Sequence, residues 1–408
     1  MLKSLGTFIS LLLLSSISFT LSFSPSSVFG NFPKSASKSQ NDLHSSADDN
    51  NEDTRRGWLG KVAGGTIVTG GLVANKIAIR GPTPYEPPIN SLKGKVIIIT
   101  GGNTGLGLES AKRMANAGAT IMLTSRSKTK GKLAIQDVQQ YCLENSGIAN
   151  NNVYSLPLDL CDLDNVKEFA NLYQKSPIGN QKIDVLLNNA GVMAVPEREL
   201  TKDGYEKTFQ TNHLGHFALT SSLLPFMNTA SREGARVVNV SSMAYTFAGK
   251  GLDIDNINGD LSYGPWDSYG QSKLQNILFT KELQRRAKDA NINLTSASLH
   301  PGLVRTDLAR YLLQDDFVSM QDKEAQKQHV NYFSPKFLAL LPLVYFSKSV
   351  ERGATTQIWL ASGQGDGIDG NFYQNCNSLK LAPYAEDMEK AKELWEISEK
   401  LSGVKYNF

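Results

Sequence analysis

Short apolar, β-branched runs alternate along this chain with stretches that look helical. The first apolar run spans residues 95–100 and leads through glycines into a helical stretch that ends at Gly118. Strands that are apolar on both faces are typical of parallel sheets covered by helices. The pattern therefore predicts a single α/β domain, a doubly wound and mostly parallel sheet with helices on both faces. The further predicted strands span 119–126, 153–160, 183–191, 236–242 and 294–302.

The turn after the first strand has the composition of a phosphate-binding loop. Its glycines let the backbone approach a pyrophosphate, and the helix that follows offers N–H groups and a favourable dipole at its N-terminus. The glycine spacing differs from the GxGxxG of larger dehydrogenases, but strand, glycine-rich turn, helix and strand follow in the order of a Rossmann-type dinucleotide-binding unit. We expect cofactor contacts from Gly101, Asn103, Thr104, Gly105, Leu106 and Gly107.

The end of the second predicted strand indicates which dinucleotide binds. Ser125 and Arg126 stand there, followed by Lys128 and Lys130. An enzyme that uses NAD tends to place an acidic residue at this point, whereas an arginine attracts a 2′-phosphate and can bind two of its oxygens. A basic loop in solvent is the alternative. Together with the dinucleotide unit, Ser125 and Arg126 predict NADP(H) as the cofactor.

The third predicted strand ends at the carboxyl edge of the sheet, where ligands bind in open α/β folds. Asp159 and Leu160 lie there and are expected to contact the cofactor. Asp159 could hydrogen-bond the adenine amine. Alternatively, it could cap the helix that begins near Asp162.

The fourth predicted strand runs into a polar turn that contains glycine. Asn188 and Asn189 are expected to pin neighbouring backbone, while the small Ala190 and Gly191 leave room for a flat ligand. The turn is therefore a further candidate for cofactor contact.

Tyr269 and Lys273 stand four residues apart, just ahead of a run that looks helical over 274–283. Residues at this spacing share a helix face. An ammonium near a phenol lowers its pKa from about 10, which makes the phenol a better proton donor and acceptor near neutrality. A tyrosine packed on the helix with its lysine in solvent is the alternative.

Several motifs, in one order over about residues 92–385, resemble the short-chain dehydrogenase/reductase family. Within the family, the chain is similar to the retinol dehydrogenases, the WW-domain oxidoreductases and the light-dependent protochlorophyllide reductases. The motifs that carry the resemblance are Thr100–Gly107, Asn188–Gly191, Thr211–Phe217, Val240–Ser242, Tyr269–Lys273 and His300–Gly302.

The resemblance implies a catalytic set. Tyr269 would be the general acid in reduction and the base in oxidation, and Lys273 would lower its pKa and bind the nicotinamide ribose. Ser242 matches the serine that holds the reacting carbonyl oxygen, while Ser241 would only satisfy backbone groups. Asn212 matches the asparagine that supports a water-linked proton path to the lysine.

The resemblance also extends the cofactor contacts beyond the sixth predicted strand. Pro301 and Gly302 close that strand, and Thr306 resembles the threonine that contacts the nicotinamide carboxamide. Thr306 could instead cap a helix near Asp307.

Other residues near these motifs have plainer interpretations. We interpret His213 and His216 as packing or helix-contact residues rather than ligands. The insert over 245–267 is rich in loop-forming residues and predicts a loop beside the active site. Trp266 within it could line a substrate pocket or anchor the loop.

The function expected from these features is NADP(H)-dependent interconversion of an alcohol and a carbonyl on a lipophilic, retinoid- or isoprenoid-like substrate. Residues 310–350 should form a substrate lid, and their apolar part, 338–346, could cover the substrate, touch a bilayer or be an ordinary packed helix. Protochlorophyllide-type reduction of a C=C bond is one alternative. A regulatory protein that binds NADP without turnover is another.

The composition of the chain limits which binding partners we expect. A net charge of +3 argues against nucleic acid as the main partner. Three cysteines do not make a disulfide framework, and the chain shows no His/Cys cluster with zinc spacing, so we expect no metal. A small lipophilic substrate is the expected partner, and the sequence also allows membrane-surface association and a homo-oligomer.

The N-terminal residues 1–53 look like a targeting leader. Lys3 and the apolar run 8–14 have the pattern of a secretory signal, and a Ser-rich stretch without acidic residues before Asp42 suits a transit peptide. Together they predict a complex plastid as the destination. Secretion through the endoplasmic reticulum is the alternative.

Residues 54–91 connect this leader to the predicted domain at 92–408. They combine a twin arginine, Arg55-Arg56, with a glycine-rich run and a proline-rich stretch. The twin arginine could be part of an export signal that leads to the thylakoid. A membrane contact or a linker is the alternative.

Overall fold

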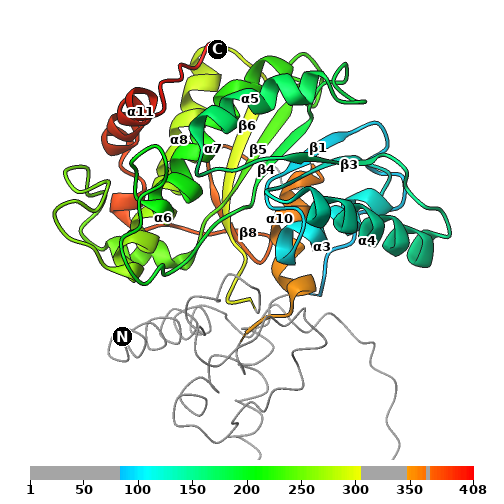
Figure 1. Ribbon diagram of the computed structural model, residues 1–408, viewed down its shortest axis with the longest axis horizontal. Helices are drawn as coiled ribbons and strands as arrows, with labels where there is room; N and C mark the ends of the chain where they lie inside the picture. Colours follow the sequence, from blue (N-terminus) through cyan, green and yellow to red (C-terminus); the bar gives the residue numbers. More distant parts are fainter. Residues whose placement is uncertain (1–82, 305–346, 364–367) are drawn as a thin grey trace, which may run out of the picture. The chain divides into compact units, whose positions relative to one another are not determined.

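The computed structural model describes residues 83–304, 347–363 and 368–408 of the chain. The predicted leader, the twin arginine and the glycine-rich run lie outside these residues, as do Thr306 and the predicted lid as far as Phe346. The described part holds one sheet with helices packed on both faces (Figure 1).

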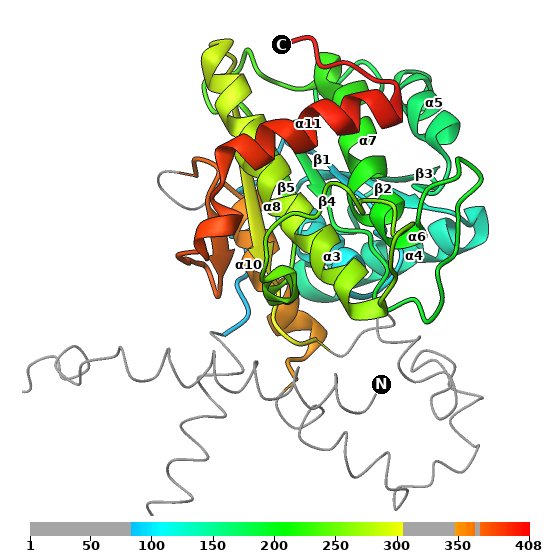
Figure 2. The same ribbon diagram turned by 90° about the vertical axis from the view of Figure 1, so that its left-hand side faces the viewer.

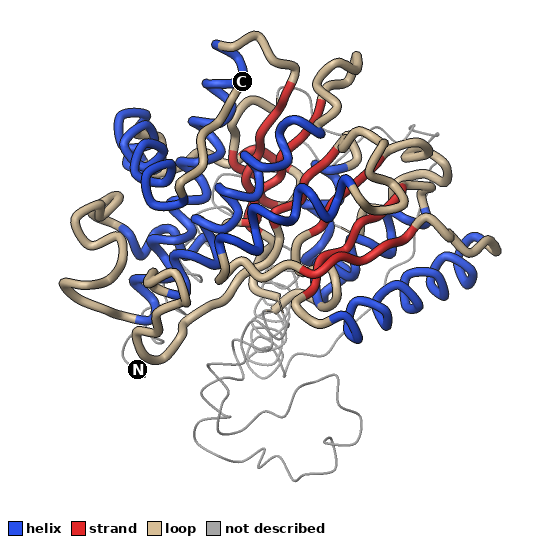
Figure 3. The backbone as a smooth tube through the Cα atoms, turned by 45° about the horizontal axis from the view of Figure 1, so that its top comes forward, coloured by secondary structure: helices blue, strands red, loops and turns tan. Residues whose placement is uncertain are grey.

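Eight strands form this single sheet (Figure 3). They are β1 Val96–Ile99, β2 Thr120–Ser125, β3 Val153–Pro157, β4 Val185–Asn188, β5 Ala235–Val240, β6 Leu294–His300, β7 Phe372–Gln374 and β8 Asn377–Ser378. The order is β3-β2-β1-β4-β5-β6-β7-β8, and only β7 and β8 pair antiparallel. The winding direction reverses between β1 and β4, which is where ligands bind in such sheets. The prediction of a Rossmann-type, mostly parallel α/β sheet is confirmed.

Helices cover both faces of the sheet (Figures 1 and 2). They include α3 Gly105–Asn116, α4 Lys128–Ser146, α5 Leu163–Gln174, α7 Gly215–Leu223, α8 Pro265–Asp289, α10 Val350–Ala361 and α11 Met388–Ser402. Ile97 and Ile99 belong to the core under α3, α4 and α10, whereas Val96 and Ile98 belong to the core under α5, α7, α8 and α11. Successive strand residues point to opposite faces, so a continuously apolar strand supports both layers. No helix within the described ranges is long and apolar enough to cross a bilayer.

The insert between β5 and α8 is more regular than the sequence predicted. Residues Met243–Ala248 form the 3₁₀ helix η4, and α8 already begins at Pro265. Proline is well suited to the first turn of a helix, because an N–H there has no intrahelical partner. The expectation of a loop over 245–267 is therefore wrong at both ends, and Trp266 lies in the first turn of α8.

The last residues of the predicted linker are attached to the domain. Tyr85 N–H donates to Thr355 Oγ1 at 3.3 Å, and Arg113 Nη1 donates to the Tyr85 carbonyl at 3.2 Å. Arg113 also lies 3.1 Å from a Glu86 carboxylate oxygen. These contacts join the start of the described chain to α3 and α10.

Candidate active site

Tyr269, Lys273 and Ser242 meet at the carboxyl end of the sheet. Tyr269 and Lys273 lie one turn apart in α8, both buried, and the Lys273 ammonium is 5.4 Å from the centre of the Tyr269 ring. Ser242 follows β5 and accepts a hydrogen bond from Ala244 N–H at 3.1 Å. The Ser241 hydroxyl donates to the Lys273 carbonyl at 2.7 Å, so it satisfies a backbone group as expected. The predicted shared helix face is confirmed, and the alternative of a solvated lysine is wrong.

Burial dominates the electrostatics of this pair. Desolvation raises the pKa of Tyr269 to about 12, opposed by a hydrogen bond with Ser242 that lowers it. Desolvation also lowers the pKa of Lys273 to about 8, because an ammonium is less stable away from water. Lys273 Nζ donates to the Val240 carbonyl at 3.0 Å. In this arrangement the pKa of Tyr269 is set by desolvation and by Ser242, and the lowering expected from Lys273 stays a prediction.

Asn212 lies in a π-helical turn, η2 Gln210–Leu214. Its side-chain oxygen accepts from Val192 N–H at 2.8 Å, and its Nδ2 donates to the Val192 carbonyl at 2.9 Å and to Ser272 Oγ at 3.0 Å. A π-turn takes carbonyl groups out of the ordinary α-helical ladder. The side chain is therefore committed to protein partners, and the main-chain oxygen of Asn212 lies 3.1 Å from His216 Nδ1.

The two histidines of the same motif are buried and paired within the fold. His213 Nε2 lies 2.9 Å from Ser398 Oγ, and His216 Nε2 lies 2.9 Å from Thr100 Oγ1. Burial lowers the pKa of His213 to about 3 and that of His216 to about 4. Both rings are therefore neutral, and their interpretation as packing and helix-contact residues is confirmed.

The turn between β1 and α3 has the shape that a pyrophosphate needs. Gly101 has a positive φ of 62°, and a Cβ on Gly107 would lie 2.5 Å from the Gly101 carbonyl oxygen. The first turn of α3 carries no acidic side chain that would repel an anion from its N–H groups. These residues therefore fit a dinucleotide phosphate. The same turn holds Asn103, Thr104, Gly105 and Leu106.

The turn after β4 is tied to this glycine turn and reaches Asn212 and Lys273. Asn189 Nδ2 donates to the Thr100 carbonyl at 2.9 Å, and the N–H groups of Asn189 and Ala190 donate to Thr100 Oγ1 at 2.9 and 3.0 Å. Gly191 follows, where a Cβ would lie 3.0 Å from the Asn212 side-chain oxygen. The expectation that these asparagines pin neighbouring backbone is confirmed for Asn189, whereas Asn188 Nδ2 donates to the side chains of Thr220 and Asn239.

The end of β2 presents positive charge beside this turn. Ser125 is buried, and Arg126 follows in an exposed position. Helix α4 begins directly afterwards, capped by Ser127, whose hydroxyl accepts from Lys130 N–H at 3.3 Å. Arg126, Lys128 and Lys130 are all exposed at this helix start.

The N-terminus of α5 is capped by Asp162 and not by Asp159. The Asp162 carboxylate accepts from Asn165 N–H at 2.9 Å. The Asp159 carboxylate accepts from Cys161 N–H at 3.0 Å and so shapes the turn after β3. Leu160 is buried in the core under α5 and α7. The helix-cap interpretation of Asp159 is therefore wrong.

The Pro301–Gly302 turn follows β6. A residue from a distant part of the chain, which the sequence analysis missed, binds this turn. Lys348 Nζ donates to the Pro301 carbonyl, 47 residues away, at 3.2 Å. Gly302 has a positive φ of 96° and packs directly on the Lys348 side chain. A lone lysine outside any motif gives no signal of such a contact.

Trp266 lies beside the Tyr269 ring. Its ring is edge-on to the Tyr269 ring at 6.5 Å and edge-on to the Phe247 ring at 5.9 Å. Because Phe247 belongs to η4, Trp266 joins the start of α8 to the segment that follows Ser242.

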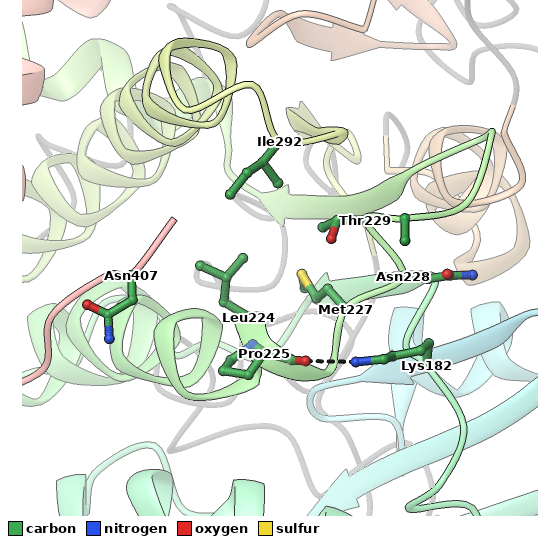
Figure 4. A pocket seen from close by; sticks show the side chains of 9 residues that line it. Lys182, Leu224, Pro225, Met227, Asn228, Thr229, Ile292 and Asn407 are labelled. Carbon is green, nitrogen blue, oxygen red and sulfur yellow. Dashed lines mark hydrogen bonds between the residues drawn. The ribbon is translucent and has the colours of Figure 1, made fainter.

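A cavity of about 290 Å³ lies away from these residues (Figure 4). Met227 precedes β5 and Ile292 precedes β6, so this cavity opens at the amino edge of the sheet. Lys182 Nζ donates across its rim to the Pro225 carbonyl at 3.0 Å. Ligands of open α/β sheets bind at the opposite, carboxyl edge, so we do not assign this cavity to the active site.

The site can now be compared with known proteins. The family model described as short chain dehydrogenase matches residues 95–316. The chain belongs to the short-chain dehydrogenase family. Its matched residues include the glycine turn, Tyr269, Lys273, Ser242 and Asn212. Members of this family are oxidoreductases that bind a nicotinamide cofactor.

Its relatives identify the branch. Retinol dehydrogenase 14 from Mus musculus is 33% identical over 319 residues, which cover 77% of this chain and 87% of the relative. Short-chain dehydrogenase TIC 32 B, chloroplastic, from Brassica napus is 34% identical over 344 residues, covering 82% and 97%. A solved structure of an uncharacterised protein from Mycobacterium Paratuberculosis is 31% identical, with a TM-score of 0.58, and covers 80% of this chain and 100% of its own. The predicted resemblance to the retinol dehydrogenase branch is confirmed.

Proposed function

We propose that this short-chain dehydrogenase uses NADP(H) to interconvert an alcohol and a carbonyl on a lipophilic substrate, with Tyr269 as proton donor and acceptor. The observation that carries the proposal is the meeting of Tyr269, Lys273 and Ser242 in a buried site at the carboxyl edge of the sheet. The bound cofactor supplies or accepts the hydride.

The protein's own residues would handle the proton and the charge on oxygen. In reduction, negative charge grows on the carbonyl oxygen, and the O–H groups of Tyr269 and Ser242 can both donate to it. Burial, which raises the pKa of Tyr269 to about 12, keeps the proton on the phenol until the substrate oxygen becomes basic. Lys273, whose pKa burial lowers to about 8, is mostly charged at neutral pH and would stabilise the phenolate left behind.

The preference for NADP(H) is supported by the end of β2. The exposed Arg126 stands where an enzyme that uses NAD tends to carry an acidic residue. Lys128 and Lys130 add positive charge at the start of α4. A 2′-phosphate is doubly charged near neutrality, so this group of cations favours it over a ribose hydroxyl.

A lipophilic substrate and a plastid location are supported by different observations. The relatives named as retinol dehydrogenases and the aromatic rings of Phe247 and Trp266 beside Tyr269 support an apolar, retinoid- or isoprenoid-like substrate. The relative from Brassica napus named as chloroplastic supports the plastid, in agreement with the leader predicted over residues 1–53.

The test is an assay of the purified protein with NADPH against lipophilic and short polar aldehydes and ketones. We expect NADPH consumption with the lipophilic carbonyls. Tight NADPH binding without turnover of any carbonyl would instead favour the regulatory alternative. Reduction of a pigment C=C bond would favour the protochlorophyllide-type alternative.

A further inference from the structure

Lys348 is a buried lysine that the proposed mechanism does not use, and it is hydrogen-bonded to the Pro301–Gly302 turn and the residue after it. Lys348 is only 4% exposed. Its Nζ donates to the Pro301 carbonyl at 3.2 Å and to Asn375 Oδ1 at 2.6 Å. A Cβ on Gly302 would lie 2.6 Å from Lys348 Cε. The Lys348 N–H also donates to the Leu303 carbonyl at 2.7 Å. The turn is therefore held by both the backbone and the side chain of one residue.

A strained turn presents the second partner of Lys348. Asn375 and Cys376 connect β7 to β8 with positive φ values of 53° and 62°. Asparagine tolerates this conformation, whereas a residue such as cysteine is rarely found in it. Cys376 N–H donates to Thr356 Oγ1 at 3.3 Å, which ties the turn to α10. The Asn375 oxygen is therefore fixed against Lys348 by the surrounding structure.

Among the residues that the structure describes, the Lys348 ammonium has polar partners but no ion pair. Within the described ranges, no carboxylate oxygen lies within 4.0 Å of its Nζ. Its field reaches the end of β6, because burial, Lys348 and Lys273 together lower the pKa of His300 to about 3. Burial lowers the pKa of Lys348 itself to about 8, so the ammonium is mostly charged at pH 7.

We propose that Lys348 is a positioning residue of the cofactor site, which fixes the Pro301–Gly302 turn and favours the reduced cofactor over the oxidised one. The inference rests on the proposed function and on the family resemblance, which implies that Lys273 binds the nicotinamide ribose and that the Pro301–Gly302 turn contacts the cofactor. The oxidised ring carries a positive charge and the reduced ring is neutral. Two buried ammonium groups near the ring therefore repel only the oxidised form.

The test compares the binding of NADPH and of NADP⁺ at pH 7 to the full chain and its variants, by calorimetric titration. Lys348→Met removes the charge, and we expect the preference for NADPH over NADP⁺ to fall by about five-fold or more, equivalent to roughly 1 kcal/mol. Lys348→Arg keeps the charge and should keep the preference. Asn375→Gly keeps the charge but removes the hydrogen-bond partner that holds the Lys348 ammonium. It should therefore weaken the binding of NADPH and of NADP⁺ alike.

A second variant separates the charge from the hydrogen bonds. Lys348→Gln is neutral and keeps an N–H donor on a side chain one atom shorter, so it should lose the preference as Lys348→Met does, even if the methionine variant folds poorly. An unchanged preference in Lys348→Gln would overturn the proposal. If the unmodified protein binds neither NADPH nor NADP⁺, the proposed function fails instead, and the two failures are therefore distinguishable.

Discussion

The Asn212 side chain and the Val192 backbone form a closed, two-point contact. Asn212 accepts from Val192 N–H at 2.8 Å and donates back to the Val192 carbonyl at 2.9 Å. Both groups are buried, and the contact joins the π-helical turn to the turn after β4. The residue that the family resemblance assigns to a proton path therefore also holds the site together.

Replacing Asn212 should accordingly destabilise the fold. Asn212→Ala leaves buried backbone donors and acceptors of Val192 without partners, and we expect a loss of about 2–4 kcal/mol in the free energy of unfolding. Urea denaturation measures it. Asn145→Ala is the matched control, because its exposed Nδ2 also donates to a backbone carbonyl, at 2.8 Å, and its loss should cost much less. Equal losses of stability in the two variants would contradict the conclusion that Asn212 stabilises the fold through its contact with Val192.

Tyr269→Phe should abolish turnover while the affinity for NADPH stays within about two-fold, since only the phenolic O–H is lost. Turnover is measured by NADPH consumption and affinity by titration. Tyr245→Phe is the control, because the Tyr245 hydroxyl is also buried and accepts from Ala382 N–H at 3.3 Å, but it is not placed in the proton transfer. Activity of Tyr269→Phe at the unmodified level would remove Tyr269 from the mechanism.

Lys273→Met should abolish activity and yet stabilise the fold at pH 7. Burial lowers the pKa of Lys273 from 10.5 to about 8, which corresponds to a cost of about 3 kcal/mol for the charged form. Loss of the hydrogen bond to Val240 offsets about 1 kcal/mol, so we expect a net gain of about 2 kcal/mol in the free energy of unfolding.

The pH dependence of this gain checks its cause. The folded-state pKa lies below the unfolded one, so the cost is fully present below about pH 8 and disappears as the pH rises to about 10.5. Urea denaturation of both proteins across this range should show the advantage of Lys273→Met shrinking. Lys288→Met, on the exposed end of α8, should show neither the gain nor its pH dependence.

Arg126→Asp should weaken the binding of NADPH by about ten-fold or more and that of NADH by far less, because a carboxylate repels the 2′-phosphate. Dissociation constants for the two cofactors provide the measurement. Arg232→Asp introduces the same charge change in an exposed position before β5 and should affect neither. An equal loss for NADPH and NADH would overturn the assignment of the cofactor.

Much of the fold was predictable because its information is local. A continuously apolar strand such as β1 has to be covered on both faces, and the glycine turn after it has to leave backbone exposed to a phosphate. The boundaries were less predictable. Pro265 and Trp266 suggest a loop by composition, but the first turn of α8 accepts proline because it needs no N–H there. Strands β7 and β8, with three and two residues, are too short to give a pattern.

The sequence by itself determined the sheet, the glycine turn and the shared helix face of Tyr269 and Lys273, because each follows from spacing within one or two elements. Only the tertiary structure decided how charge behaves in the site. Desolvation depends on everything that packs around a group, which is why the pKa of Tyr269 rises although a lysine lies beside it. The same is true of Lys348, whose partners Pro301 and Asn375 lie 47 and 27 residues away along the chain and meet it only in the folded protein.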